Sequence, residues 1–124
     1  MVKKIILDTN FLLTCVKQKI EFFEEIPQMG FKIVIPTNVI SELERLSKGK
    51  AMKLADESKL VLRIIQKKDF EKTTLPGKKV DNALILFLRK NKDFTIATLD
   101  KGIQMKVKNP KLVIRGKKKL VFLR

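Results

Sequence analysis

One stretch constrains the fold of this chain more than any other. The unbroken apolar run of residues 5–7 ends abruptly in Asp8, followed by two small polar residues, Thr9 and Asn10. An apolar run without polar alternation is typical of a central parallel strand covered on both faces. A carboxylate is tolerated there only where the strand leaves the core. In open α/β sheets, ligands bind at the carboxyl ends of the strands where the strand order reverses. The sequence therefore places Asp8 at the mouth of a candidate site.

A second apolar run, residues 94–99, ends in an acid in the same way, at Asp100. Short apolar runs stopped by turn residues alternate with segments of helical periodicity along the rest of the chain. Besides the first run, we expect strands at 31–36, 70–73, 94–100, 111–115 and 120–123, and helices at 10–17, 21–26, 39–46, 51–66, 80–88 and 103–107. This alternation predicts an α/β fold, a three-layer α/β/α sandwich with a mostly parallel central sheet.

Three of these elements carry more specific expectations. Thr37 or Asn38 should cap the helix at 39–46. Pro27 and Gly30 should end the helix at 21–26. The segment 80–88 is apolar nearly all round, which predicts a helix packed deep in the domain.

Length and composition set the broad class. With 124 residues, 44% of them hydrophobic, we expect one domain, residues 1–124, with a core of its own. No stretch has the length of a membrane span or a signal sequence, so a cytoplasmic protein is expected. Cys15 is the single cysteine, which excludes a disulfide within the chain and is better interpreted as a small buried hydrophobe.

The residue types that are missing narrow the chemistry. The chain has no His, Tyr or Trp. Catalytic dyads that use histidine, histidine-based zinc sites, imidazole-driven RNA cleavage and tyrosyl-DNA intermediates are therefore excluded. No glycine-rich loop has the spacing of a phosphate cradle. If the chain is an enzyme, its acids and a metal ion must carry the reaction.

The charge is strongly positive. The sequence has 28 Lys and Arg against 13 Asp and Glu, a formal net charge of +15. A polyanion such as nucleic acid is the natural partner, because it releases counterions on binding and is attracted from a distance. Solvated lysines on a very soluble protein are the alternative.

Four acids fall where a solvated helix face would not put them. Asp8 and Asp100 end apolar runs, Glu42 lies on the inner face of its expected helix while Glu44 points to water, and Asp81 begins an apolar helix. Each has a structural alternative: an N-cap for Asp8 and Asp100, a helix-dipole partner for Asp81, an edge position for Glu42. Clustered together, such carboxylates repel unless a hard cation neutralises them, and oxygen ligands suit Mg²⁺ or Mn²⁺.

These residues resemble the PIN-domain nucleases in type and in order, over nearly the whole chain. No single segment is specific, because Asp-Thr-Asn alone is common, so the ordered set carries the resemblance. Its segments are Leu7-Asp8-Thr9-Asn10, Ser41-Glu42-Leu43, Val80-Asp81-Asn82-Ala83-Leu84 and Ala97-Thr98-Leu99-Asp100.

The resemblance implies a metal-binding hydrolase, an endoribonuclease that cleaves single-stranded RNA. Asp8, Glu42, Asp81 and Asp100 would be its catalytic and metal-binding acids. Magnesium or manganese would lower the pKa of a water that attacks the phosphorus in line, leaving a 5′-phosphate and a 3′-hydroxyl. Some members have a further acid beside the third acid or after the fourth, where this chain has Asn82 and Lys101. One and two metal ions therefore both stay open.

Other residues receive supporting roles by the same resemblance. Asn10 and Thr98 would orient the acids. Apart from the resemblance, the charge and position of Lys78 and Lys79 one turn ahead of Asp81 make them candidate RNA-binding residues that would hold phosphate, with a solvated loop as the alternative.

The partners to consider are RNA, a second copy of the chain as a homodimer, and either an antitoxin or a ribosome-assembly factor. A membrane is not among them. The family includes toxin-type ribonucleases and nucleases that process ribosomal RNA, and the basic turn at 116–119 tilts the choice towards structured or ribosomal RNA. The alternative function is a catalytically idle PIN-fold module for RNA binding or assembly.

Overall fold

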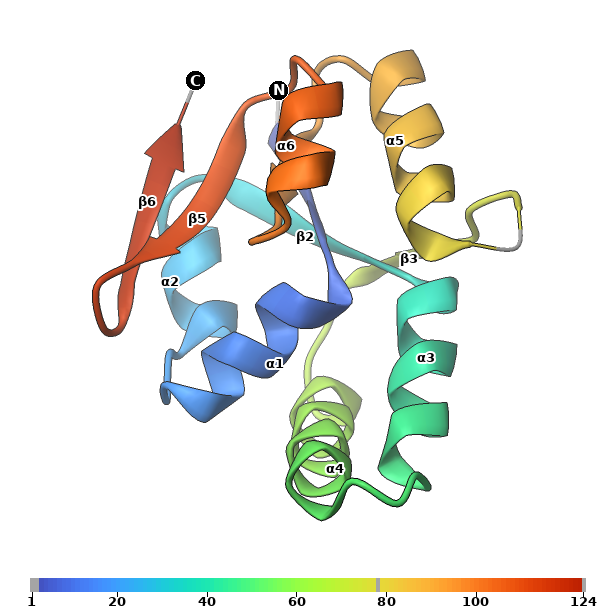
Figure 1. Cartoon of the computed structure of the whole chain (residues 1–124). Coiled ribbons are helices and arrows are strands. Elements are labelled where there is room, and N and C mark those ends of the chain that lie inside the picture. The colour runs from blue at the N-terminus through green and yellow to red at the C-terminus, as the bar shows by residue number, and fades with distance from the viewer. Residues whose placement is uncertain (1–2, 78, 124) are drawn as a thin grey trace.

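The sheet of this protein is built around β1 (Lys3–Leu7), which pairs in parallel with β2 (Phe31–Pro36) on one side and with β4 (Thr95–Ala97) on the other. The computed structural model describes residues 3–77 and 79–123. β3 (Glu71–Thr73) and β5 (Lys111–Arg115) extend the sheet in parallel, and β6 (Lys119–Leu123) closes it antiparallel to β5. The strand order is β3-β2-β1-β4-β5-β6 (Figure 1).

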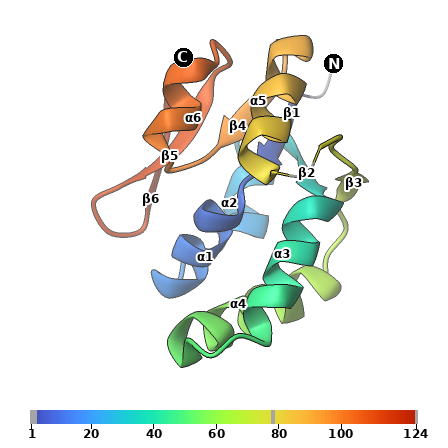
Figure 2. The ribbon, with the colours of Figure 1, turned by 45° about the vertical axis from the view of Figure 1, so that its right-hand side comes forward.

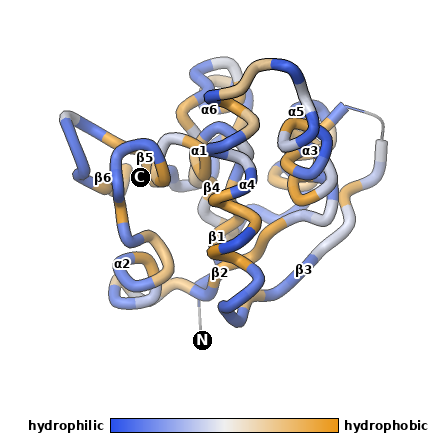
Figure 3. Tube along the Cα trace, turned by 90° about the horizontal axis from the view of Figure 1, so that it is seen from below, coloured by the Kyte–Doolittle hydropathy of each residue, from blue (hydrophilic) through white to orange (hydrophobic). Residues whose placement is uncertain are grey.

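Helices cover both faces of this sheet, which confirms the predicted three-layer α/β/α sandwich. One face is covered by α1 (Thr9–Lys17), α2 (Phe22–Gln28), α3 (Thr37–Ser47) and α4 (Met52–Gln66), and the other by α5 (Val80–Lys90) and α6 (Lys101–Lys106). The division of the strand residues follows from their alternation: Ile5 and Leu7 pack under the first group of helices, whereas Ile6 packs under the second. Figure 3 shows the resulting concentration of hydrophobic residues along the central strands.

The segment 80–88 forms the predicted helix, but the expectation that this helix is packed deep in the domain is wrong. α5 turns Leu84 and Leu88 towards the sheet, where neither is exposed, but Leu86 is 53% exposed. The physical reason is its place in an outer layer, because a helix there contacts the sheet along one side only. An apolar residue on its free side therefore remains in contact with solvent.

Two further expectations about helix ends are corrected. α3 begins one residue after Pro36, so Thr37 and Asn38 lie inside its first turn and cap nothing. Their side chains contact the loop before α5 instead. In α2, Pro27 lies within the last turn, and the helix ends at Gln28, ahead of Gly30 with φ of +92°. Only glycine adopts that conformation readily, so Gly30 is the residue that turns the chain into β2.

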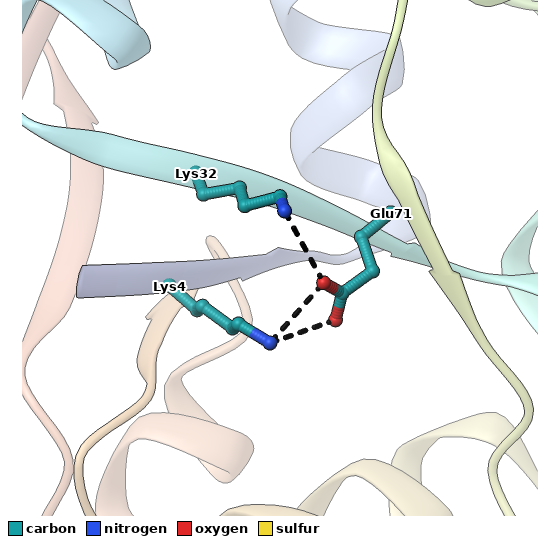
Figure 4. A network of polar contacts seen from close by, with 3 residues as sticks. All are labelled: Lys4, Lys32 and Glu71. Atoms are coloured by element: carbon teal, nitrogen blue, oxygen red, sulfur yellow. Dashed lines mark hydrogen bonds and ion pairs between the residues drawn. The ribbon is translucent and has the colours of Figure 1, made fainter. Parts of the chain in front are cut away.

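A polar contact joins three neighbouring strands at the exposed part of the sheet. Glu71 on β3 accepts from Lys4 on β1 at 3.1 Å and lies 3.7 Å from Lys32 on β2 (Figure 4). The bond from Lys4 lowers the pKa of the Glu71 carboxyl. Since β3 has only three residues, this bridge supports an edge strand that has few ladder bonds of its own.

The helices that the structure describes are all too short or too polar to cross a bilayer.

Candidate active site

Asp8 and Asp100 follow the two strands at which the order of the sheet reverses. From β1 the chain first adds β2 and β3 on one side, and later adds β4 and β5 on the other. Leu7 lies opposite Ala97 in the register, and the Asp8 amide donates to the Ala97 carbonyl at 3.1 Å. Ligands bind at such reversals in open α/β sheets, since the flanking loops diverge there. Asp8 therefore occupies the position in the fold that the sequence predicts.

The carboxylate of Asp8 is buried and held at both oxygens. The side chain accepts from the Thr9 amide at 2.8 Å through Oδ1 and from the Thr98 hydroxyl at 2.9 Å through Oδ2. Asp8 is only 3% exposed, and no ion pair within residues 3–77 and 79–123 involves it. The pKa of Asp8 is raised from 3.8 to about 6. Burial is the largest cause, repulsion from Asp81 and Glu42 adds a smaller rise, and the hydrogen bonds from Thr98 and Thr9 oppose it.

Asp100 serves as the N-cap of α6. Its Oδ1 accepts from the Gly102 amide at 2.8 Å and from the Ile103 amide at 3.4 Å. The Asp100 amide in turn donates to the Thr98 hydroxyl at 3.1 Å. Thr98 therefore connects the two acids, because the same hydroxyl donates to Asp8. The half-buried Asp100 keeps its second carboxylate oxygen, Oδ2, outside the cap.

Glu42 reaches the same region from α3. It is half-buried, and its Oε1 accepts a short hydrogen bond from the Thr9 hydroxyl at the start of α1. Its Oε2 lies 3.7 Å from Nη2 of Arg45, one turn along α3. Glu44, on the opposite side of the helix, is exposed as predicted. Thr9 therefore links the Glu42 side chain to the residue directly after Asp8.

Asp81 lies in the first turn of α5 and, contrary to the expectation of apolar surroundings, is exposed. The free side of the outer-layer helix explains this difference too. The pKa of Asp81 is raised nevertheless, first by partial desolvation and then by repulsion from Asp100 and Glu42. Asp81 also repels Asp8, so its carboxylate interacts electrostatically with those of all three other acids.

A groove of about 840 Å³ separates α3 from the start of α5 and receives Glu42 from one wall and Asp81 from the other. We call it the site groove; Thr37, Asn38, Ser41, Arg45, Lys79, Val80 and Asn82 complete its lining. Asn38 holds the two walls together. Its side chain donates to the Leu75 carbonyl at 3.1 Å and accepts from the Leu75 amide at 2.8 Å.

The donor chemistry of these acids fits a hard divalent ion, although their present positions do not form a finished site. All the candidate ligands are carboxylate oxygens, as Mg²⁺ and Mn²⁺ prefer. In the part of the chain that the structure describes, no three acids are grouped closely enough to hold one ion. The Asp81 side chain is exposed at the start of α5. A bound cation would also offset the repulsion that raises the pKa of Asp8 and Asp81.

The predicted supporting residues have different outcomes. Thr98 is buried against Asp8. Asn10 is exposed on α1, and within the described residues its side chain forms no hydrogen bond to an acid. Lys79 is exposed in the wall of the site groove, and Lys78 lies outside the described residues. Sequence reasoning missed Thr9 and Arg45 as neighbours of Glu42, although the spacing of Arg45 three residues after Glu42 on one helix could have indicated the second.

Comparison with known proteins places this chain in a family. A family model described as a PIN-like domain matches residues 5–118. The chain is 32% identical over 121 residues to ribonuclease VapC4 of Methanocaldococcus jannaschii, covering 93% of this chain and 92% of the relative. It is also 29% identical over 109 residues to the rRNA-processing protein fcf1 of Schizosaccharomyces pombe. That match covers 84% of this chain and spans 53% of the relative.

Solved structures agree with this assignment. The structure of the PIN domain endonuclease Utp24 matches 96% of this chain with a TM-score of 0.78 and 26% identity, over 90% of its own length. A domain of a functionally unknown protein from Methanocaldococcus jannaschii has a TM-score of 0.61 at 16% identity, covering 98% of both chains. The second likeness concerns the fold alone.

Proposed function

This chain belongs to the PIN-like domain family, and from that premise we propose that it is a metal-dependent endoribonuclease that cleaves single-stranded RNA. One observation carries the proposal. The buried Asp8 carboxylate stands at the reversal of strand order, near Glu42 and Asp81, and no cation pairs with it in the described part of the chain. Burying an acid in this way costs stability, which is a common feature of functional sites.

Each acid has a role in this proposal. Asp8, Glu42, Asp81 and Asp100 would hold one or two Mg²⁺ or Mn²⁺ ions. When bound, such an ion supplies the positive charge that lowers the pKa of the attacking water and neutralises the phosphate. Thr98 is a positioning residue, because its hydroxyl fixes Oδ2 of Asp8. Thr9 fixes Glu42 in the same manner.

The basic residues of the site groove would place the RNA backbone. Lys79 and Arg45 line the same groove as the two acids Glu42 and Asp81. Cations at this position would attract the phosphates on either side of the scissile bond, while carrying no base information. Attack by water on the phosphorus would leave a 5′-phosphate and a 3′-hydroxyl.

The names of the relatives suggest two biological settings for the same chemistry. One relative is a ribonuclease that this chain matches over nearly its full length, and the other is an rRNA-processing protein. We propose RNA as the substrate, residues 1–124 as one PIN-like domain, and an antitoxin or a ribosome-assembly factor as the partner in the respective setting. Cleavage of purified ribosomal RNA at one position rather than many would favour the second setting.

The rival function is an idle PIN-fold module that binds RNA without cutting it. The observation in its favour is that Asp8 and Asp100 both accept hydrogen bonds at the starts of helices, which by itself would explain their presence. Capping explains neither Glu42 nor the repulsion at Asp81. The two functions make opposite predictions about cleavage.

The deciding experiment is an endonuclease assay on end-labelled single-stranded RNA with Mn²⁺. We expect cleavage by the wild type, a loss of at least about 100-fold in Asp8→Asn, and the same direction in Glu42→Gln. Glu44→Gln is the matched control, because Glu44 is an exposed acid of the same helix. Its rate should equal that of the wild type. Equal rates in Glu42→Gln and Glu44→Gln would remove Glu42 from the site, and inactivity of the wild type would favour the idle module.

A further inference from the structure

Two further depressions border α5 on the side that faces α6. The first, of about 440 Å³, shares Asn82 with the site groove and runs past Ile85 and Leu86 to Arg89 and Lys106. We call it the α5 trough. The second, of about 410 Å³, shares Arg89 and Lys106 with the trough. The shared lining residues place the three depressions next to one another, from the acids to the far end of α5.

The far end of this path is strongly basic. Arg89, Lys92, Lys106 and Lys108 line the second depression together with Asn109, and we call it the basic basin. All four cations are exposed. Among the residues that the structure describes, no acid lines either the basin or the trough. A groove lined with charges of one sign concentrates ions of the opposite sign.

The basin rests on a fixed framework. Nε of Arg89 donates to the Lys106 carbonyl at 3.1 Å, which joins the end of α5 to the end of α6. The buried Asn109 donates to the carbonyls of Asn91 and Phe94, each at 3.0 Å. These bonds hold the floor of the basin while leaving the ammonium groups of its lysines directed to solvent.

The relation between α5 and α6 gives the path its direction. The two helices stand side by side in both views (Figures 1 and 2). Asp81 lies in the first turn of α5 and Asp100 caps α6, so both helices begin at the acids. The basin lies where both end. An 11-residue helix such as α5 spans about 16 Å, which is the length of a few nucleotides of extended single strand.

Helix dipoles are the simpler explanation of the basic residues, since cations near helix C-termini stabilise the helix. This explains Arg89 and Lys106, which lie in the last turns of α5 and α6. It does not explain Lys92 and Lys108, which lie beyond the helix ends. Nor does it account for a trough that borders both the basin and the site groove.

We propose that single-stranded RNA leaves the site groove along the α5 trough and seats its backbone in the basic basin. The proposal rests on the proposed function, because it takes the scissile phosphate to lie at the acids. The half-exposed Leu86, midway along the trough, offers an apolar contact to a base. The chain would accordingly hold an RNA several nucleotides away from the bond that it cuts.

The test compares RNAs of two lengths. Binding is measured by fluorescence anisotropy in Ca²⁺, so that it does not depend on cleavage, with single-stranded RNAs of about 4 and about 16 nucleotides. The basin variant is Lys92→Ala with Lys108→Ala. We expect the ratio of long-RNA to short-RNA affinity to fall about tenfold. The salt slope for the long RNA should fall by about 1.4, as for two lost single-strand phosphate contacts.

The matched control is Lys53→Ala with Lys59→Ala, which removes the same charge from exposed positions of α4 on the opposite face of the sheet. Its affinity ratio should equal that of the wild type. An unchanged ratio in the basin variant, or an equal fall in the control, would overturn the path. The nuclease proposal is judged separately by cleavage. If the wild type cuts RNA and the basin variant keeps the affinity ratio of the wild type, only the proposed RNA path is wrong. If the ratio falls in the basin variant and the wild type cuts no RNA, only the nuclease proposal is wrong.

Discussion

Asp8 combines a structural and a chemical role in one side chain. Its Oδ1 accepts from the first amide of α1, and its Oδ2 accepts from Thr98 on the neighbouring strand connection. The carboxylate is thereby held in one orientation although its charge is poorly hydrated. The N-cap and the ligand interpretation of Asp8 are therefore compatible, since a carboxylate oxygen that accepts one hydrogen bond retains a lone pair for a cation.

The raised pKa of Asp8 predicts how the metal-free protein responds to pH. Burial raises this pKa from 3.8 to about 6. Between these values the folded protein holds a proton that the unfolded chain has released, so stability falls as the pH rises through this range. The loss at neutral pH is roughly 3 kcal/mol. The unfolding free energy of Asp8→Asn should lack this part of the pH dependence. The variant should be as stable as the wild type, or more stable, at pH 7.

Chemical denaturation in a chelator at pH 4, 5, 6 and 7 would measure the difference between the two proteins. Subtracting one curve from the other cancels the contributions of distant groups. A variant that is less stable than the wild type at pH 7 would contradict the prediction, because the carboxylate would then support α1 more than its burial costs.

Thr98 is predicted to position both acids. Thr98→Val keeps the buried volume but removes the donor to Asp8 and the acceptor for the Asp100 amide. We expect a loss of about 1–3 kcal/mol in unfolding free energy together with slower cleavage. Thr98→Ser keeps the hydroxyl and should recover most of the cleavage rate. A Thr98→Val variant that cleaves as fast as Thr98→Ser would show that the hydroxyl does not position the acids.

At the scale of elements, three helix starts face the candidate site. Asp8 and Asp100 occupy the N-caps of α1 and α6, and Asp81 lies in the first turn of α5. The partial positive charge of a helix N-terminus stabilises nearby carboxylates. This arrangement therefore allows several acids to stay close together before any cation is bound. α3 is the exception, since it contributes Glu42 from its middle.

The two walls of the site groove are predicted to depend on Asn38. Its two hydrogen bonds to the Leu75 backbone connect α3 with the loop that leads to Asp81. Asn38→Ala should lower the unfolding free energy by about 1–3 kcal/mol, because it leaves the Leu75 groups without these partners. It should also slow cleavage, since Asp81 would be less well placed.

Thr37→Val is the matched control for this prediction, measured by the same urea denaturation and cleavage assays. It removes the exposed contact between the Thr37 and Thr74 hydroxyls on the same turn. We expect a change below about 0.5 kcal/mol, as for most exposed positions. Comparable losses of unfolding free energy in Asn38→Ala and Thr37→Val would mean that the hydrogen bonds between Asn38 and Leu75 have no special role.

The whole molecule carries a formal charge of +15, and this charge coexists with the four candidate acids of the site. The two features are complementary if the positive surface attracts RNA and the acids act only where the backbone passes them. Affinity for RNA should then fall steeply with salt and vary little with base sequence, because phosphate contacts carry no base information.

Lys79 allows a local test of this attraction between the positive surface and RNA, because it lies beside Asp81 in the wall of the site groove. Lys79→Ala should lower the salt slope of single-stranded RNA binding by about 0.7, the value for one phosphate contact. Lys53→Ala removes the same charge from the exposed side of α4 and should leave the slope unchanged. A titration of binding against salt in Ca²⁺ measures both. If the two variants behave alike, the interaction is a diffuse one that no single lysine dominates.

The sequence by itself determined the architecture and the positions of two acids. Residues 31–36 and 111–115 form strands with the predicted bounds, because short apolar runs ended by proline, glycine or charge leave few alternatives. Asp8 and Asp100 lie at one edge of the sheet because parallel strands end on the same side, which topology alone requires.

Only the tertiary structure decided which side chains meet. The hydrogen bonds from Thr9 to Glu42 and from Asn38 to Leu75 join residues 33 and 37 positions apart. Local periodicity describes one element at a time and carries no information about the element that packs beside it. The exposure of Asp81 and Leu86 has the same origin, since the layer that a helix occupies decides which of its sides remains in water. Folding therefore decided how the acids, the groove and the basic basin lie relative to one another.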